Sequence, residues 1–201
     1  ITFFKVVYRR HTNFSMESIE QTMTGSLASG STQTVTVSRN GDLIHRTYLE
    51  IGAEASLLTN GKDDNYGHSL LNYVELEIGG QRIDKHYGHW MEVWSELTEP
   101  NPTGHKKTTT GATDTTGTTF QNMSGMGGVE DGEGNMANAV FWVPLQFWFC
   151  RNPGLALPLI ALQYHEVKVI LNHRFASTMT TAPDKMSLWC DYIYLDTDER
   201  R

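Results

Sequence analysis

The chain has 201 residues, of which 39% are hydrophobic, and its formal net charge is −7. A chain of this length can bury one full core, so we expect a single domain over residues 1–201. The acidic balance, with a pI near 5.6, argues against direct binding of nucleic acid, because neutralising phosphates requires clustered Lys and Arg. The longest apolar runs contain proline and are shorter than the roughly 20 residues that cross a bilayer, so the sequence predicts no transmembrane segment.

A strand and turn signal lies at residues 34–51. Valine alternates with Thr and Ser over residues 34–38, Asn40-Gly41 follows, and residues 42–51 resume a β-rich pattern. Asn and Gly tolerate the positive φ angles of a type I′ turn. We therefore predict a hairpin in which Val37 lies opposite Ile44.

Residues 74–78, "VELEI", place apolar side chains on one face and glutamates on the other, which predicts a half-buried strand. Gly79-Gly80 breaks this strand, and residues 81–87 continue as a second one. A short helix follows, because Trp90, Val93, Trp94 and Leu97 recur at helical spacing on one side.

The segment from Glu99 to Asn138 is rich in Thr, Gly, Asn and Met, and we expect a long surface loop over residues 99–138. Three further strands are predicted in residues 139–150, 164–171 and 188–195, which are rich in aromatic and β-branched residues. Many strands with one minor helix indicate an antiparallel sandwich or barrel.

The histidines raise the question of a metal site. His86, His89 and Glu92 lie close together and resemble the cupin metal motif, but two ligands on one strand face need an even separation. No nucleophile elbow or phosphate-binding glycine loop is present. We therefore predict no catalytic, metal or cofactor site, with a cupin-type metalloenzyme as the weaker alternative. Cys150 and Cys190 lie in apolar contexts and are expected to be buried free thiols.

The segment "RNPGLALPLIAL", residues 151–162, is unusually apolar for a connection. A loop backbone normally needs water, and Pro158 interrupts a simple strand. We expect this segment to be covered by a helix of the same chain or by another subunit.

Several stretches resemble the major capsid proteins of nucleocytoplasmic large DNA viruses, such as phycodnaviruses and iridoviruses. The resemblance is carried by "FFKVVYRRHTNFSMESIEQT", "SRNGDLI", "VELEIGGQRIDKHYGHWMEVWSELT", "VPLQFWFCRNPGLALPLIALQYHEVKV" and "DYIYLDTDERR". These stretches are similar to the N-terminal half of that family, and the segment from Asn101 to Asn135 departs from it.

The resemblance implies an eight-stranded antiparallel jelly-roll sandwich with a short helix and a long surface loop. This chain would be the first of two jelly rolls, and the second would be absent from it. Family members form homotrimers with a pseudo-hexagonal outline that tile an icosahedral shell over an internal membrane. The expected function is that of a structural capsid subunit without enzymatic activity, which contacts neighbouring capsomers and minor capsid proteins. Its expected location is the virion, assembled in the host cytoplasm.

Subunit contacts are expected around the apolar connection and the predicted helix. The candidate residues are Arg82, His86, Trp90, Leu155, Leu157 and Leu159. Asn122, in the sequon Asn-Met-Ser, is a candidate glycosylation site in the long loop. A lectin-like jelly roll that binds glycans is the alternative function, because this fold also hosts lectins and enzymes.

Overall fold

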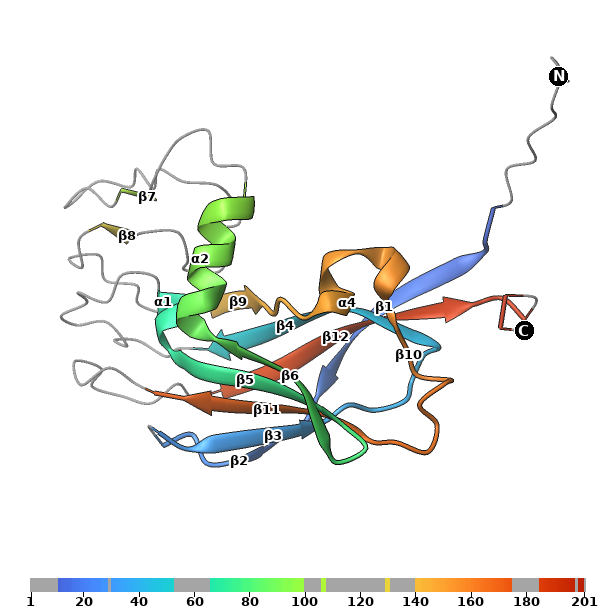
Figure 1. Ribbon diagram of the computed structural model, residues 1–201, viewed down its shortest axis with the longest axis horizontal. Coiled ribbons are helices and arrows are strands. Elements are labelled where there is room, and N and C mark those ends of the chain that lie inside the picture. Colours follow the sequence, from blue (N-terminus) through green and yellow to red (C-terminus); the bar gives the residue numbers. More distant parts are fainter. Residues whose placement is uncertain are drawn as a thin grey trace, which may run out of the picture.

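The computed structural model describes residues 11–28, 30–52, 66–99, 106–107, 129–130, 140–174, 185–197 and 199–200. Within them, two antiparallel five-stranded sheets face each other across one apolar core (Figure 1). In the first sheet the order is β1-β12-β4-β10, and β9 also pairs with β4. Its strands are β1 (Phe14–Gln21), β4 (Leu43–Gly52), β9 (Val140–Pro144), β10 (Leu157–Pro158) and β12 (Lys185–Leu195).

The second sheet has the order β2-β3-β11-β5-β6. Its strands are β2 (Met23–Gly25), β3 (Thr32–Thr36), β5 (Leu71–Ile78), β6 (Gln81–Tyr87) and β11 (Val167–His173). The helical elements are α1 (Tyr66–Ser69), α2 (Gly88–Thr98), α4 (Trp148–Arg151) and the 3₁₀ turn η1 (Pro153–Leu155). None of the helices in the described ranges is long and apolar enough to cross a membrane.

The chain repeatedly changes sheet, which gives the jelly-roll connectivity. β1 belongs to the first sheet and β2, after one intervening residue, to the second, so one pass of the chain serves both. The predicted all-β antiparallel jelly-roll sandwich is confirmed. Ten strands are described in the sandwich instead of eight, because the first pass splits into two strands and β10 is only a two-residue addition beside β4.

The predicted hairpin around Asn40-Gly41 is wrong. β3 pairs with β2 and β11 in the second sheet, whereas β4 pairs with β12 in the first. The link between them crosses the sandwich: Val37 N donates to Val167 O (2.9 Å) and Asp42 N donates to Ile193 O (3.0 Å). Gly41 packs where a Cβ would lie 2.9 Å from Tyr192 Cβ, so the glycine allows close packing at a crossover instead of a turn.

β5 and β6 form a hairpin at Gly79-Gly80, where the sequence indicated only a break between two strand-like runs. Both glycines have positive φ angles, 59° and 82°, which L side chains rarely adopt. Val74 and Leu76 are fully buried, as the alternation in "VELEI" predicted. The hairpin ends at Tyr87, and α2 follows at once.

The strand predicted over residues 139–150 is only partly correct. β9 ends at Pro144, which has no N–H to continue a ladder, and the chain then forms α4. Phe149 and Cys150 of α4 are buried. Most of the predicted 99–138 loop lies outside the described residues. Within it, β7 (Lys106–Lys107) and β8 (Val129–Glu130) pair in parallel as a separate two-stranded sheet.

Candidate assembly surface

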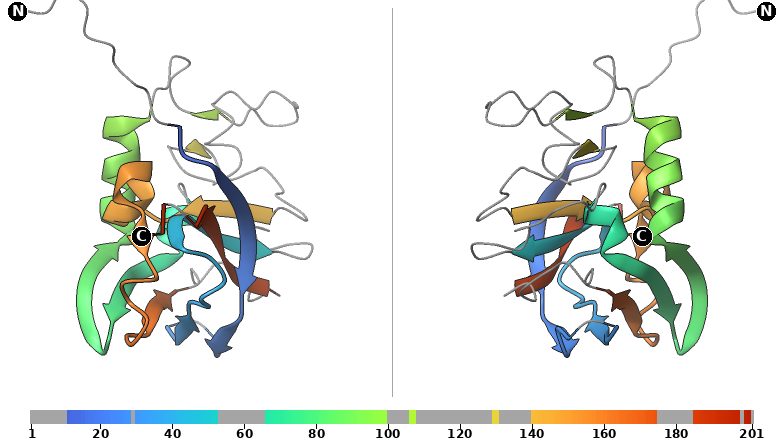
Figure 2. Two further views of the ribbon diagram at one scale, coloured as in Figure 1. Left: turned by 90° about the vertical axis from the view of Figure 1, so that its right-hand side faces the viewer. Right: turned by 90° about the vertical axis from the view of Figure 1, so that its left-hand side faces the viewer.

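The elements β6, α2 and α4–η1 lie on one side of the sandwich, toward the viewer in Figure 1 and on the left of the left-hand view in Figure 2. We call this side the helical face. Its elements carry large exposed apolar side chains: Ile83 (51% exposed), Tyr87 (54%), Val93 (43%), Leu97 (78%) and Leu155 (53%). Exposed apolar side chains that gather on one side of a domain mark a contact with another protein.

Helix α2 is fixed to the sandwich through its first turn. A Cβ on Gly88 would lie 2.1 Å from the carbonyl oxygen of His68 and 2.3 Å from that of Leu71, so only glycine fits. His68 Nδ1 on α1 lies 2.5 Å from Glu92 Oε2 on α2, which ties the two helices together. Gly88 forms the buried side of α2 together with Met91 and Ser95.

The sequence predicted the helix but not its orientation. The stripe of Trp90, Val93, Trp94 and Leu97 was the natural core-facing side, yet Val93 and Leu97 are exposed and the two tryptophans are only half-buried. The close approach at Gly88 fixes the helix with Met91 and Ser95 inward, Trp90 packed against the core, and Val93 and Leu97 outward.

A stack of aromatic rings runs from the core to this surface. His86 stacks between Phe147 (centroids 5.0 Å apart) and Trp90 (4.5 Å), and Trp90 stacks on Trp94 (5.6 Å). The guanidinium of Arg151 lies over the Trp94 ring, 4.2 Å from its centroid. Such cation–π contacts contribute about 0.5–2 kcal/mol. The stack holds the two tryptophans rigidly at the surface.

His86 is 7% exposed, and its Nε2 lies 3.2 Å from Asp84 Oδ2. Burial lowers the pKa of His86 and Arg151 lowers it further, while the Asp84 carboxylate acts in the opposite direction. Because burial has the largest effect, the neutral imidazole is favoured, and its flat ring is well suited to stacking between Phe147 and Trp90.

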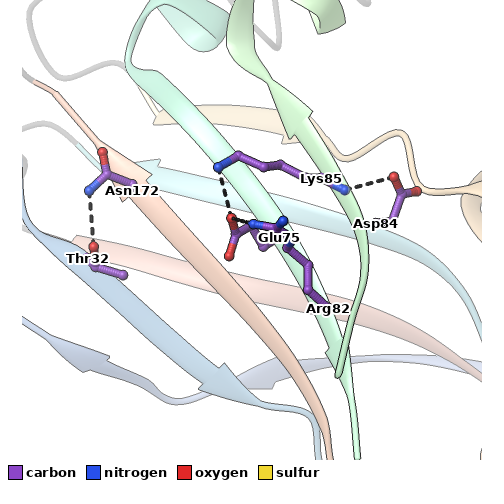
Figure 3. A network of polar contacts seen from close by, with 6 residues as sticks. All are labelled: Thr32, Glu75, Arg82, Asp84, Lys85 and Asn172. Atoms are coloured by element: carbon purple, nitrogen blue, oxygen red, sulfur yellow. Dashed lines mark hydrogen bonds and ion pairs between the residues drawn. The ribbon is translucent and has the colours of Figure 1, made fainter. Parts of the chain in front are cut away.

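A charged network borders the helical face on β5 and β6 (Figure 3). Glu75 Oε1 accepts from Lys85 Nζ (2.9 Å) and from Arg82 Nη1 (3.3 Å). Burial alone would raise the pKa of Glu75, but the two cations hold it below its ordinary value. Lys85 Nζ also lies 3.8 Å from the centroid of the Tyr73 ring. A polar rim beside an apolar centre is the usual composition of a protein interface.

The six predicted contact residues divide into two groups. Arg82, with its side chain 62% exposed, Trp90 and Leu155 lie on the helical face. Leu157 (5% exposed) and Leu159 (3%) are buried in the core of their own sandwich. Leu157 pairs with Ile44 of β4, and the expected interface at these two leucines stays a prediction, which their burial does not favour. His86 is likewise buried and supports the surface from beneath.

The described residues contain no group of three or more His, Cys, Asp or Glu side chains placed to bind a metal ion. His86 is taken up by stacking, whereas Glu92, in contact with His68, lines a small pocket together with His89, so the three predicted ligands do not share one site. Cys150 and Cys190 are buried free thiols. Burial raises the pKa of Cys150 to about 11 and raises that of Cys190 as well. Asn122 lies outside the described residues.

Solved structures of viral capsid proteins share this fold. The chain superposes on a chain of the PBCV-1 virus capsid quasi-atomic model with a TM-score of 0.72 and 40% identity, covering 99% of this chain and 46% of that one. The Faustovirus major capsid protein shares the fold at a TM-score of 0.61 with 13% identity, covering 100% of this chain and 57% of that one. The architecture is therefore that of a capsid jelly roll.

Sequence comparison gives the family. Residues 2–196 match the family described as "Major capsid protein N-terminus". The major capsid protein of Pyramimonas orientalis virus is 51% identical, covering 100% of this chain and 49% of that protein. The major capsid protein of Paramecium bursaria Chlorella virus 1 is 42% identical, covering 100% of this chain and 44% of that protein. The chain belongs to the major capsid protein family, and it spans about half the length of these relatives.

Proposed function

We propose that this chain is a structural subunit of an icosahedral viral capsid and that it forms trimeric, pseudo-hexagonal capsomers. The observation that carries the proposal is the match to capsid proteins over residues 2–196, at 51% identity to one relative. The match extends over nearly the whole chain, and a capsid subunit functions through its surfaces.

The helical face is the proposed contact with a neighbouring jelly roll. Leu97 and Leu155 are the exposed apolar centre, Trp90 is held from beneath by His86, and Arg82 stands at the charged border. An obligate interface resembles a protein core divided in two, which agrees with apolar side chains held on rigid elements. The neighbouring roll would be the second roll of a double jelly-roll chain or a roll of another copy.

The proposed role is structural rather than enzymatic. The buried histidines and cysteines described above are engaged in packing, and the relatives are named as capsid proteins. Neighbouring capsomers and minor capsid proteins are the proposed partners, in a shell over an internal membrane. The proposed location is the virion, with assembly in the host cytoplasm.

Native mass spectrometry of the naturally expressed protein, released gently from its source, tests this function. We expect a metal-free trimer of a chain about twice as long as this one, in proportion to the 46–49% coverage of its relatives. A monomer or dimer that carries stoichiometric metal would contradict the capsid function, and His86, His89 and Glu92 would then be the residues to mutate.

Substitutions on the helical face test the proposed contact. Leu97→Asp and Leu155→Asp place a charge on the apolar centre, so they should dissociate the trimer while leaving the thermal unfolding temperature of the sandwich nearly unchanged. Thr36→Asp is the matched control, because Thr36 is exposed on β3 in the second sheet. A trimer that withstands both leucine substitutions would show that the helical face does not make the contact between copies.

A further inference from the structure

The strand β1 forms an open edge of the first sheet. It pairs with β12 over Phe14–Gln21 in an uninterrupted antiparallel register. No other strand among the described residues pairs with it. β1 and β12 lie on the side of the sandwich opposite the helical face, on the right of the left-hand view in Figure 2.

This edge lacks the usual protection against pairing with another strand. β1 contains no proline, lysine or bulge. Six of its eight residues are exposed, namely Phe14–Ser18 and Glu20. Phe14 is 61% exposed and Met16 is 50% exposed. By contrast β6, an edge strand of the second sheet, has an irregular register and carries Arg82 and Lys85. A long regular edge with exposed apolar side chains is a template for strand addition.

The hydrogen-bonding pattern shows which backbone groups face outward. Asp196 N donates to Asn13 O (3.2 Å), and these residues lie directly opposite each other in the register. Inward and outward pairs alternate along an antiparallel strand. The N–H and C=O groups of Phe14, Met16, Ser18 and Glu20 therefore point to the open edge.

The charges around the edge select its partner. Glu17, Glu20 and, across the register, Asp191 give it three carboxylates. Pairing of β1 with the β1 of a second copy would bring like charges together, which is unfavourable. An extended basic segment rich in β-forming residues fits better. Residues 1–10, "ITFFKVVYRR", have this composition, with Lys5, Arg9 and Arg10 beside Phe, Val and Tyr.

We propose that residues 1–10 of one copy add as a strand to the β1 edge of a neighbouring copy. Residues 11–13 continue away from β1 instead of turning back along its open edge (Figure 1). The inference rests on the proposed assembly of copies, and it assigns to this edge a link between them that is separate from the helical face.

Disulfide trapping between two populations of the full chain tests the link. One population carries Met16→Cys, and the other carries Val6→Cys or Val7→Cys to cover both faces of the added strand. The native Cys150 and Cys190 do not compete, because both are buried and burial raises both pKa values. We expect a disulfide-linked heterodimer in the mixture, at several times the yield obtained when Thr36→Cys, on exposed β3, replaces Met16→Cys.

Two further substitutions separate strand addition from chance collision. Ser18→Pro, in the Met16→Cys background, removes an outward N–H and leaves the bonds to β12 intact, so it should lower the yield several-fold. Ser18→Ala is its control, because both substitutions remove the Ser18 Oγ contact with Asp191. Glu17→Lys should also lower the yield, because it repels the basic segment.

The outcomes are distinct. When both cysteines are placed in one chain, a disulfide that forms within that chain, and never between the two populations, would overturn the proposal in favour of the chain's own segment. A yield equal to that of the Thr36→Cys control would overturn it outright. Native mass spectrometry of the same samples under reducing conditions reports assembly separately. A trimer without the cross-link would therefore refute this link and leave the capsid function standing, whereas a monomer without it would refute both.

Discussion

Gly88 shows how a single residue determines what the surface presents. Its missing Cβ lets α2 start against the carbonyl oxygens of His68 and Leu71, and the rotation that results turns Leu97 outward. Gly88→Ala should lower the free energy of unfolding by about 1–3 kcal/mol or more, because backbone atoms must shift. Gly154→Ala is the control, since its Cβ would meet only the Asn152 side chain at 3.3 Å. Equal losses in urea unfolding would contradict this role of Gly88.

His86 gives the fold a pH dependence with a defined sign. Because burial lowers its pKa in the folded state below the ordinary 6.5, the unfolded chain binds more protons in the acid range. The stability that neutral His86 contributes is fully present above about pH 6.5, and it is lost as the pH falls below 6.5 through the lower pKa of the folded state. His86→Phe keeps the stack between Trp90 and Phe147 without a titrating ring, so the loss of stability between about pH 7.5 and 5.5 should shrink.

The control for this measurement is His89→Phe, on the exposed first turn of α2. It removes an exposed histidine that takes no part in the stack, so its slope of unfolding free energy against pH serves as the reference for His86→Phe. His173 is also buried, and burial lowers its pKa, so a residual slope should remain in His86→Phe. A slope that His86→Phe does not change would assign the whole effect to other groups.

At the scale of elements, the segment from η1 to β10 carries both a core residue and a surface residue. Leu157 is 5% exposed and Leu155 is 53% exposed, two positions apart. Leu157→Ala should cost about 2–5 kcal/mol of unfolding free energy, because it leaves a cavity. Leu155→Ala should stay within about 0.5 kcal/mol and should weaken only the contact between copies. Chemical unfolding with sedimentation of both variants checks this division, which similar losses of stability would disprove.

Local sequence patterns predicted an element well where the alternation of its own residues decides which side chains are buried. The alternation in "VELEI" predicted the burial of Val74 and Leu76, and Gly79-Gly80 marked the break between β5 and β6. The patterns failed where a distant partner decides. Gly41 follows an Asn, as in a hairpin. The two flanking segments nevertheless belong to different sheets, because β3 pairs with β11 and β4 pairs with β12.

The division of the candidate contact residues into buried and exposed ones has the same cause. A one-dimensional pattern shows that residues 154–162 are apolar, but it does not show which of the leucines pack against β4 and which face outward. That depends on the antiparallel pairing of Leu157 with Ile44. Nor does spacing reveal that α2 starts in close contact with β5 at Gly88 and leaves Val93 and Leu97 exposed.

At the scale of the whole molecule, the sandwich should be independent of the long insertion between α2 and β9. The two short strands of this insertion, β7 and β8, pair with each other and with neither main sheet. Deleting residues 105–134 removes both strands and leaves residues 99–104 and 135–139 to connect α2 with β9. Loop-closure entropy changes slowly with length, so the free energy of unfolding should change by only about 1 kcal/mol.

The deletion therefore separates folding from surface properties. The deleted chain should keep its cooperative unfolding and its oligomeric state, measured by circular dichroism and native mass spectrometry. A replacement of residues 105–134 by a Gly/Ser linker of equal length controls for the shortening itself, because it keeps the closure entropy and removes only the sequence. If both variants lose cooperative unfolding, the insertion contributes to the core. If the deletion alone does so, the remaining connection is too short to let α2 and β9 keep their places.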